Sequence, residues 1–151
     1  GNANHVRIDV NAYLPDGRTA GLVRLPPAER LPQALLAWTW IRPATDWATV
    51  TPVVLDRPPK RPDENRLRRA LAESLRHAGY PAPVAVDISP FSRFQGAPPA
   101  FRVPSPDRNP RYHAVVSFAE PVTGPVIAGR LRHFGVGLFR PWTGGSEGAA
   151  G

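Results

Sequence analysis

Five stretches of the chain have the hydrophobic pattern of β-strands. Apolar and polar residues alternate over 5–14, 83–88 and 112–118, which is typical of strands with one buried face. A run of apolar and β-branched residues over 48–56 favours a further strand, and a last short strand is expected over 135–140. The pattern therefore predicts a sheet built from short strands.

The clearest helix signal covers 63–78. Asp63 is a good N-cap, and Gly79 is the natural residue to end the helix. A second, short and distorted helix is expected over 121–132, and another short helix within 26–38. The apolar stripe of the first helix consists of Leu67, Ala70, Leu71, Leu75 and Ala78.

The order of elements from 48 to 141 is strand, helix, strand, long loop, strand, weak helix, strand. This is the βαββαβ order of a ferredoxin-like (RRM-like) α+β fold with an antiparallel sheet, here with a C-terminal glycine-rich loop. Helices cover one face of such a sheet, and the other face is often open to single-stranded RNA. We expect three parts: N-terminal strands and a connector over 1–44, the ferredoxin-like domain over 45–142, and a disordered tail over 143–151.

Charge narrows the choice of partner. The formal net charge is +7, and Lys60 is the only lysine among 19 basic residues. Arginine forks onto phosphate and stacks on bases, which favours nucleic acid; the alternative is that a GC-rich genome raises the arginine content. The chain has no cysteine, which excludes disulfides and cysteine-based zinc sites. It also has no methionine, and we expect a piece of a larger parent protein.

The segment 127–137 combines glycines with cations. Gly129 precedes five residues that include Arg130 and Arg132, and Gly135-Val-Gly137 follows. Glycines allow a backbone to approach a ligand closely, and backbone N–H groups in a concave run suit an anion. The segment is therefore predicted to be an anion cradle for phosphate.

The glycine-rich loop resembles that of the RAMP superfamily of CRISPR-associated RNA-binding proteins, and three further stretches look like one family with it. The four segments are the glycine-rich loop 127–137 and the stretches 47–57, 112–118 and 121–129. Together they resemble the C-terminal, repeat-processing part of the fused subunit of type I-U (I-G) CRISPR systems, over roughly residues 45–141. In the glycine-rich loop, Ile127 stands where the family pattern has its first glycine.

The resemblance implies metal-independent endoribonuclease cleavage of CRISPR precursor RNA, without any cofactor. The 2′-hydroxyl attacks the adjacent phosphate and leaves a 2′,3′-cyclic phosphate. The partners would be the CRISPR repeat RNA or crRNA and other subunits of the interference complex, in the cytoplasm and away from membranes. Two alternatives remain open: a non-catalytic subunit that binds the crRNA handle, and a protein-interaction domain.

Such cleavage needs an acid and a base, and histidine is suited to both tasks. His113 is the first candidate, because its strand phase places it on the expected open sheet surface. His133 is the second candidate, as a phosphate or base contact or as the base. His77, in the last helical turn four residues after Glu73, is expected to have a structural role, and His5 none.

Cations and aromatic residues supply the candidate RNA contacts. Arg57, Lys60 and Arg61 follow the first core strand, where they are suited to hold the RNA backbone or stabilise charge in the transition state. In the long loop 89–111, phenylalanines alternate with arginines, and aromatic rings stack on bases. The alternative is that these phenylalanines pin the loop to the core, which is expected for Phe91 more than for the other two. The loop candidates for RNA contact are Phe94, Phe101 and Arg102.

A metal site is not expected. The histidines are scattered, and the sequence has no His-x-x-x-His motif and no carboxylate cluster. A two-metal nuclease is therefore not favoured.

Overall fold

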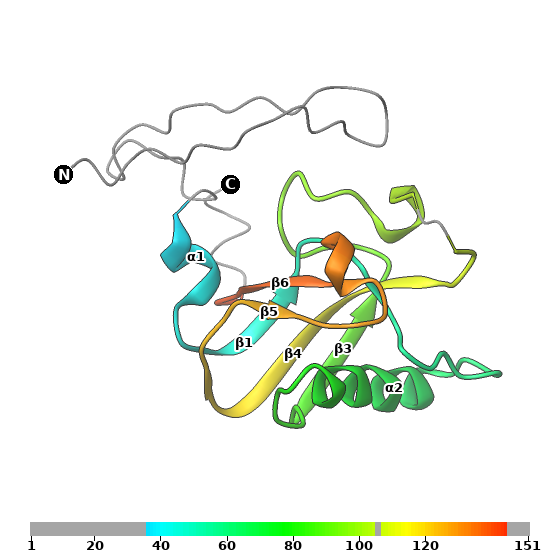
Figure 1. Cartoon of the computed structure of the whole chain (residues 1–151), viewed down its shortest axis with the longest axis horizontal. Helices are drawn as coiled ribbons and strands as arrows, with labels where there is room; N and C mark the ends of the chain where they lie inside the picture. Colours follow the sequence, from blue (N-terminus) through cyan, green and yellow to red (C-terminus); the bar gives the residue numbers. More distant parts are fainter. Residues whose placement is uncertain (1–35, 105–106, 145–151) are drawn as a thin grey trace. The chain divides into compact units, whose positions relative to one another are not determined.

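The fold is a six-stranded antiparallel sheet with one long helix on one face (Figure 1). A computed structural model describes residues 36–104 and 107–144. Along most of its width the strand order is β3-β4-β1-β6-β5, and β2 pairs with the beginning of β4. The strands are β1 (Ala44–Thr49), β2 (Val53–Val54), β3 (Ala85–Ser89), β4 (Arg111–Val122), β5 (Val126–Ile127) and β6 (Leu138–Pro141).

This topology confirms the ferredoxin-like α+β fold. The four main strands lie in the order β3-β4-β1-β6, so the first and third strands of the βαββαβ unit are central. Every paired neighbour is antiparallel. β3 and β6 fall on the predicted stretches, shifted toward the C-terminus. The strand predicted over 5–14 lies outside the described residues, as does most of the predicted tail.

The second predicted helix, over 121–132, is wrong. β4 continues to Val122, β5 follows, and between β4 and β6, a stretch that the structure describes throughout, the only helical turn is the 3-10 helix η4 (Arg132–Phe134). Pro125 has no N–H to donate to a helix, and Gly129 has a φ of +98°, which lies outside helical geometry. The residues before η4 therefore pair as strand or turn.

The helix predicted over 63–78 is confirmed as α2 (Glu64–His77). The Asp63 side chain accepts a hydrogen bond of 2.8 Å from the Arg66 amide, which satisfies one free N–H of the first turn. Gly79 follows the C-cap with a φ of +98°, a conformation that glycine adopts at little cost. The other described helix, α1 (Ala37–Ile41), begins near the end of the short helix predicted within 26–38, whose first ten residues lie outside the described part.

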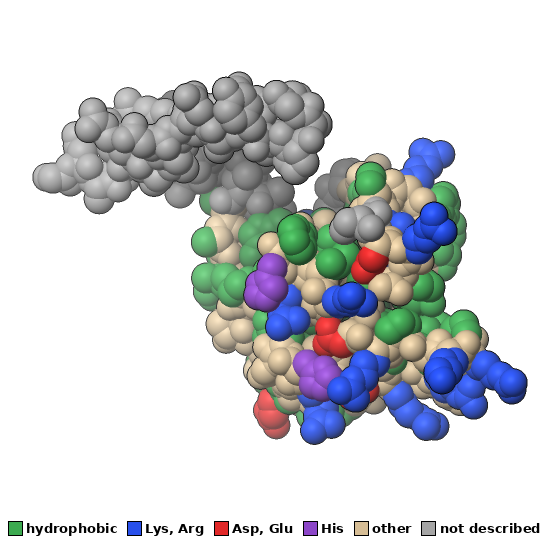
Figure 2. Space-filling model, turned by 45° about the vertical axis from the view of Figure 1, so that its right-hand side comes forward, with side chains coloured by type: hydrophobic (Ala, Val, Ile, Leu, Met, Phe, Trp, Pro, Cys, Tyr) green, Lys and Arg blue, Asp and Glu red, His purple; other side chains and the backbone are tan. Residues whose placement is uncertain are grey.

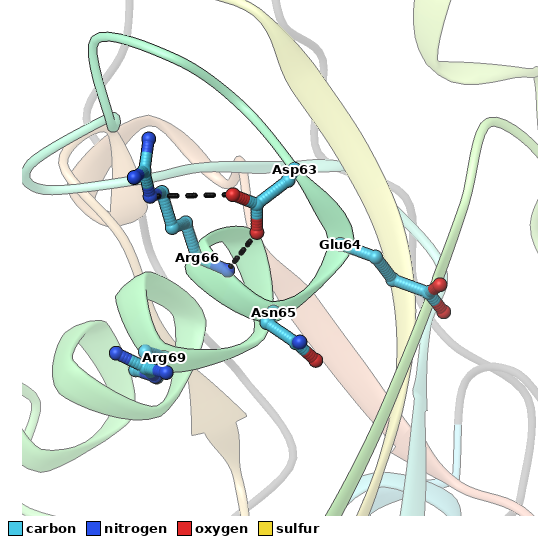
Figure 3. A pocket seen from close by; sticks show the side chains of 5 residues that line it. All are labelled: Asp63, Glu64, Asn65, Arg66 and Arg69. Carbon is cyan, nitrogen blue, oxygen red and sulfur yellow. Dashed lines mark hydrogen bonds and ion pairs between the residues drawn. The ribbon is translucent and has the colours of Figure 1, made fainter.

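The first turn of α2 also forms a shallow polar hollow (Figure 3). Asp63 and Arg66 form an ion pair of 3.2 Å there, in addition to the capping bond. Asp63 and Arg66 pair with each other, so helix capping accounts for the polar groups of this hollow and no ligand is needed to explain them. Its lining residues are Asp63, Glu64, Asn65, Arg66 and Arg69.

The hydrophobic core lies between α2 and the sheet. Leu71 and Leu75 of α2 belong to the same buried cluster as Trp47 of β1 and Phe139 of β6. The alternation predicted for β4 is confirmed on this face, where its inward side chains belong to the same buried cluster. They are Ala114, Val116 and Phe118.

The strand predicted over 48–56 is divided into two. β1 ends at Thr49, residues 50–52 bend, and β2 resumes at Val53. Pro52 has no N–H to give to a ladder, and the amides of Val50 and Thr51 turn to the Leu138 carbonyl instead. The backbone and side-chain groups of residues 49–52 are therefore available for hydrogen bonds to the strand's neighbours, the loop after β3 and the segment before β6.

The second face of the sheet is covered in part, around His113 of β4, although an open surface was expected. Residues 90–104, which we call the strap, form a long loop from the end of β3 toward the beginning of β4, and they contact the sheet near Thr49 and His113 (Figure 1). Ser92 Oγ donates to the Thr49 carbonyl at 2.7 Å, and Arg140 of β6 lies 5.0 Å from the centre of the Phe94 ring. The strap contains one 3-10 turn, η3 (Ala100–Arg102).

Candidate functional site

The backbone amides of the glycine-rich segment are mostly bonded inside the protein. Arg130 donates its amide hydrogen to the Val54 carbonyl and Gly137 donates to the Pro52 carbonyl, both at 2.9 Å. The amides of Ala128, Arg132, Phe134, Gly135 and Leu138 also have internal acceptors. The predicted backbone anion cradle is therefore wrong, because these donors are not available to a phosphate.

Two of the glycines instead permit close packing of backbone on backbone. A Cβ at Gly129 would lie 2.4 Å from the Val54 carbonyl oxygen, and one at Gly137 would lie 2.0 Å from the Ala128 carbonyl oxygen. Both residues also have positive φ values. Gly135 has positive φ as well, but its surroundings are open. The segment 128–137 is thus a tightly folded support.

Two of the three basic side chains of the segment face solvent. Arg130 and His133 are exposed and Arg132 is half-buried, with its guanidinium bonded to the Gly129 carbonyl at 3.2 Å. The charge that this segment can offer a ligand is therefore on side chains, and Arg130 is the freer of its two arginines.

His113 is buried, with 1% of its surface exposed. Its Nε2 lies 2.9 Å from the Pro98 carbonyl, which only accepts, so Nε2 carries the proton. Its Nδ1 then accepts from the Thr49 hydroxyl at 2.9 Å. The expected position on an open surface is wrong, because the strap covers this side chain, and Pro98 of the strap and Thr49 of β1 occupy its two ring nitrogens.

His113 makes the stability of the domain depend on pH. Burial lowers the pKa of His113 below its ordinary value, and hydrogen bonds at Pro98 and Thr49 oppose part of this shift. Below about pH 6.5 the unfolded chain binds a proton that the folded chain excludes. We expect the free energy of unfolding to be highest above this pH and to fall as the pH drops toward the lowered pKa.

Urea denaturation between pH 5 and 8 measures this effect. His113→Gln cannot titrate, so its free energy of unfolding should be lower than the wild type's at pH 8 but should fall less between pH 7 and 5. Equal pH slopes in the two proteins would contradict a neutral, buried His113.

The structure brings His77 together with two carboxylates. His77 is 45% exposed, and its Nδ1 lies 3.2 Å from Asp56 Oδ2. The other ring nitrogen, Nε2, is 3.6 Å from Glu73 Oε1 on the preceding turn of α2. Asp56 is 17% exposed, and its own amide donates to the buried Ser74 hydroxyl at 3.0 Å. Asp56 is therefore held in place and orients the imidazole.

This pair lies close to the glycine-rich segment. The Arg130 amide is bonded to Val54, two residues before Asp56, and two residues of extended chain span about 7 Å. Arg57 is exposed beside Asp56, and neither Arg57 nor Arg130 has an ion pair with a described acid. Arg57 and Arg130 are therefore cations without a described acidic partner whose backbones lie near the Asp56–His77 pair.

Exposed cations continue from this pair along one face of the molecule. Figure 2 shows Lys and Arg side chains gathered on this view, with histidine side chains and few acidic ones among them. Lys60 and Arg61 are also exposed, as predicted for the connector before α2, although no contact joins them to the His77 pair. We call Arg57, His77 and Arg130, with Asp56 behind them, the His77 site.

The aromatic residues of the strap differ from the expectation. Phe94 is half-buried beneath Arg140, whereas Phe91, which was expected to pin the loop, is exposed. Phe101 and Arg102 are exposed, as a role in contact would require.

Asp56 is the residue whose place in the site the sequence did not indicate. The spacing of Glu73 and His77 was visible because both lie on one helix. Asp56 follows β2, so only the packing of α2 against the sheet brings it to His77.

Within residues 36–104 and 107–144, no group of three or more acidic or histidine side chains could hold a metal ion. In the same residues, no helix combines the length and the apolar character needed to cross a membrane.

Comparison with known proteins identifies the family. Searches among curated proteins and solved structures found no match. The model of a family described as "CRISPR-associated protein, GSU0054 family" matches residues 29–141, which is well over half of the chain. The chain therefore belongs to the GSU0054 family of CRISPR-associated proteins.

Proposed function

We propose that this domain binds CRISPR repeat RNA and cleaves it at the His77 site. The observation that carries the proposal is the exposed Asp56–His77 pair, anchored by Ser74 and flanked by Arg57 and Arg130. Membership of a CRISPR-associated family supports RNA as the substrate. Other subunits of the interference complex are the proposed protein partners.

The chemistry follows from the arrangement of the imidazole. Asp56 accepts a hydrogen bond from Nδ1–H of His77, so Nε2, which lies 3.6 Å from Glu73 Oε1, is the ring nitrogen that takes the proton from a ribose 2′-hydroxyl. The new bond joins the 2′-oxygen to phosphorus, and the bond from phosphorus to the 5′-oxygen breaks. The products are a 2′,3′-cyclic phosphate and a 5′-hydroxyl.

Two further groups complete the proposed reaction. Arg57 and Arg130 stabilise the negative charge that develops on the phosphate. His133, exposed in the same segment as Arg130, is the candidate phosphate contact or proton donor to the leaving oxygen. His113 has no place in this scheme, because the strap separates its ring from solvent.

The contribution of the flanking cations to binding is testable by salt titration. Arg57→Ala/Arg130→Ala should lower the affinity for the repeat RNA. Each lost phosphate contact on a single strand reduces the slope of log affinity against log salt by about 0.7, so the double variant should lose about 1.4. Fluorescence anisotropy with a labelled repeat RNA measures both quantities.

Arg66→Ala/Arg68→Ala is the matched control, because it removes the same charge from residues already paired with Asp63 and Glu64. The control should keep a slope closer to that of the wild type. If both double variants lose affinity equally, net charge alone explains binding and the His77 site is not the contact. An absence of binding at low salt would favour a protein-interaction domain.

A further inference from the structure

The strap presents two phenylalanine rings to solvent. Phe91 is 59% exposed and Phe101 is 68% exposed, although both belong to a segment packed on the sheet. The same strap partly buries Phe94 against Arg140, so the segment is able to place an aromatic ring inward. Exposed aromatic pairs are costly in water and mark surfaces that meet a ligand or partner.

The two rings form a right-angled corner. Their centroids are 6.2 Å apart and their planes are inclined at 85°. A flat ligand that stacks on one ring therefore meets the other ring nearly edge-on, which is the favoured arrangement for aromatic groups. A nucleobase has the flat shape and the π-face that this corner fits.

The corner is held by a fixed backbone. His113 Nε2 donates to the Pro98 carbonyl at 2.9 Å, and the Ala100 amide donates to the Pro90 carbonyl at 2.9 Å. The second bond joins the residues that precede Phe91 and Phe101. A platform fixed before binding loses little conformational entropy when a ligand arrives.

The strap and the glycine-rich segment are fastened to the same part of the chain. Ser92 binds the Thr49 carbonyl, and Thr51 Oγ1 donates to the Gly135 carbonyl at 2.8 Å. Both segments are therefore hydrogen-bonded to residues 49–52. The strap that carries the aromatic corner and the segment that bears Arg130 are thus neighbours in the fold.

Charge decides the kind of partner. The described strap carries Arg93 and Arg102 and no acidic residue. Arg93 is bonded to Asp87 at 2.7 Å, whereas Arg102 follows Phe101 and is exposed. An aromatic corner beside a free arginine fits a base and its phosphate. Bases in a duplex are already stacked, so the fitting ligand is a single strand.

We propose that Phe91 and Phe101 form a stacking platform for single-stranded RNA, with Arg102 on the adjoining phosphate. The proposal rests on the RNA-binding function proposed above and adds the base contact to it. Ferredoxin-like RNA-binding domains commonly stack bases on the open sheet face. Here the strap covers the part of that face around His113 and presents two of its own aromatic rings to solvent.

An oligonucleotide that lacks bases separates stacking from charge. The wild-type chain should bind a uridine oligonucleotide more tightly than an abasic oligonucleotide of equal length. Phe91→Ala/Phe101→Ala should lower the affinity for the uridine strand by about tenfold or more and leave the affinity for the abasic strand within about twofold. Phe91→Tyr/Phe101→Tyr keeps two aromatic faces and should bind like the wild type.

Val84→Ala is the control, because Val84 is another exposed apolar residue, at the edge of β3. It should bind both strands like the wild type, and circular dichroism should show all variants folded. Equal wild-type affinity for the two strands would overturn the platform and leave phosphate binding intact. An alanine double variant with unchanged affinity for uridine would overturn it too. Binding of neither strand at low salt would overturn both the platform and the proposed function.

Discussion

Replacing His77 with alanine is expected to slow the cleavage of CRISPR repeat RNA by about 10²–10⁴-fold, the usual contribution of a positioned acid or base. The dissociation constant for the RNA should change by less than about twofold, because Arg57 and Arg130 remain. Single-turnover cleavage with saturating protein, together with a binding titration, separates the two effects. The His77 side chain is 45% exposed and lies outside the buried core, so the variant should fold.

The competing assignment is His133. His133→Ala should reduce cleavage less than His77→Ala does, or weaken RNA binding, if its role is contact with the phosphate. Loss of cleavage in His133→Ala with full activity in His77→Ala would place the base in the glycine-rich segment. Arg76→Ala tests for a nonspecific effect at the end of α2, because Arg76 is exposed beside His77.

Replacing Gly137 with alanine is expected to destabilise the domain by about 3–5 kcal/mol, the range of severe single substitutions. The new Cβ would meet the Ala128 carbonyl oxygen at 2.0 Å and Val53 Cγ2 at 3.0 Å. In addition, alanine is strained at the φ of +79° found there. Urea denaturation measures the loss as a lower midpoint.

Gly135→Ala is the matched control. Its φ of +77° imposes a similar backbone strain, but a Cβ there would meet nothing within 4 Å. The expected cost is therefore only about 1–2 kcal/mol. Equal, mild losses in the two variants would contradict the close crossing of backbones in this segment.

These two glycines show how the sequence motif and its structural role diverge. The spacing of glycines and arginines correctly marked 127–137 as special. It predicted amides directed at an anion, whereas the amides of Arg130 and Gly137 bind the residues around β2. One glycine can let a backbone approach a ligand, and another can let it approach a second backbone. The two cases cannot be distinguished from the sequence.

Local signals predicted local structure well. α2 begins after Asp63 and ends before Gly79 as expected, because the cap, the apolar stripe and the C-terminal glycine lie within the element itself. The helix predicted over 121–132 was wrong because its geometry depends on distant contacts. A Cβ at Gly124, for example, would lie 2.2 Å from the Trp40 carbonyl oxygen.

The site residues show the same difference between local signals, which the sequence contains, and distant contacts, which it does not reveal. Strand alternation correctly placed His113 on the face opposite to Ala114 and Val116, but it gave no information on what covers that face. Ser92 and Pro98 close it through contacts with Thr49 and His113. The sequence likewise did not indicate Asp56 as the carboxylate partner of His77, because the two residues belong to different elements that meet only in the folded chain.

The central claim is that the chain cleaves CRISPR repeat RNA by attack of a 2′-hydroxyl at the His77 site. The most direct measurement incubates an end-labelled repeat RNA with the wild-type chain in EDTA and maps the ends of the products. We predict one major cut, with a 2′,3′-cyclic phosphate on the upstream fragment and a 5′-hydroxyl on the downstream fragment, and no such cut with His77→Ala. Intact RNA at a protein concentration that binds it, or fragments with 5′-phosphates, would contradict the account.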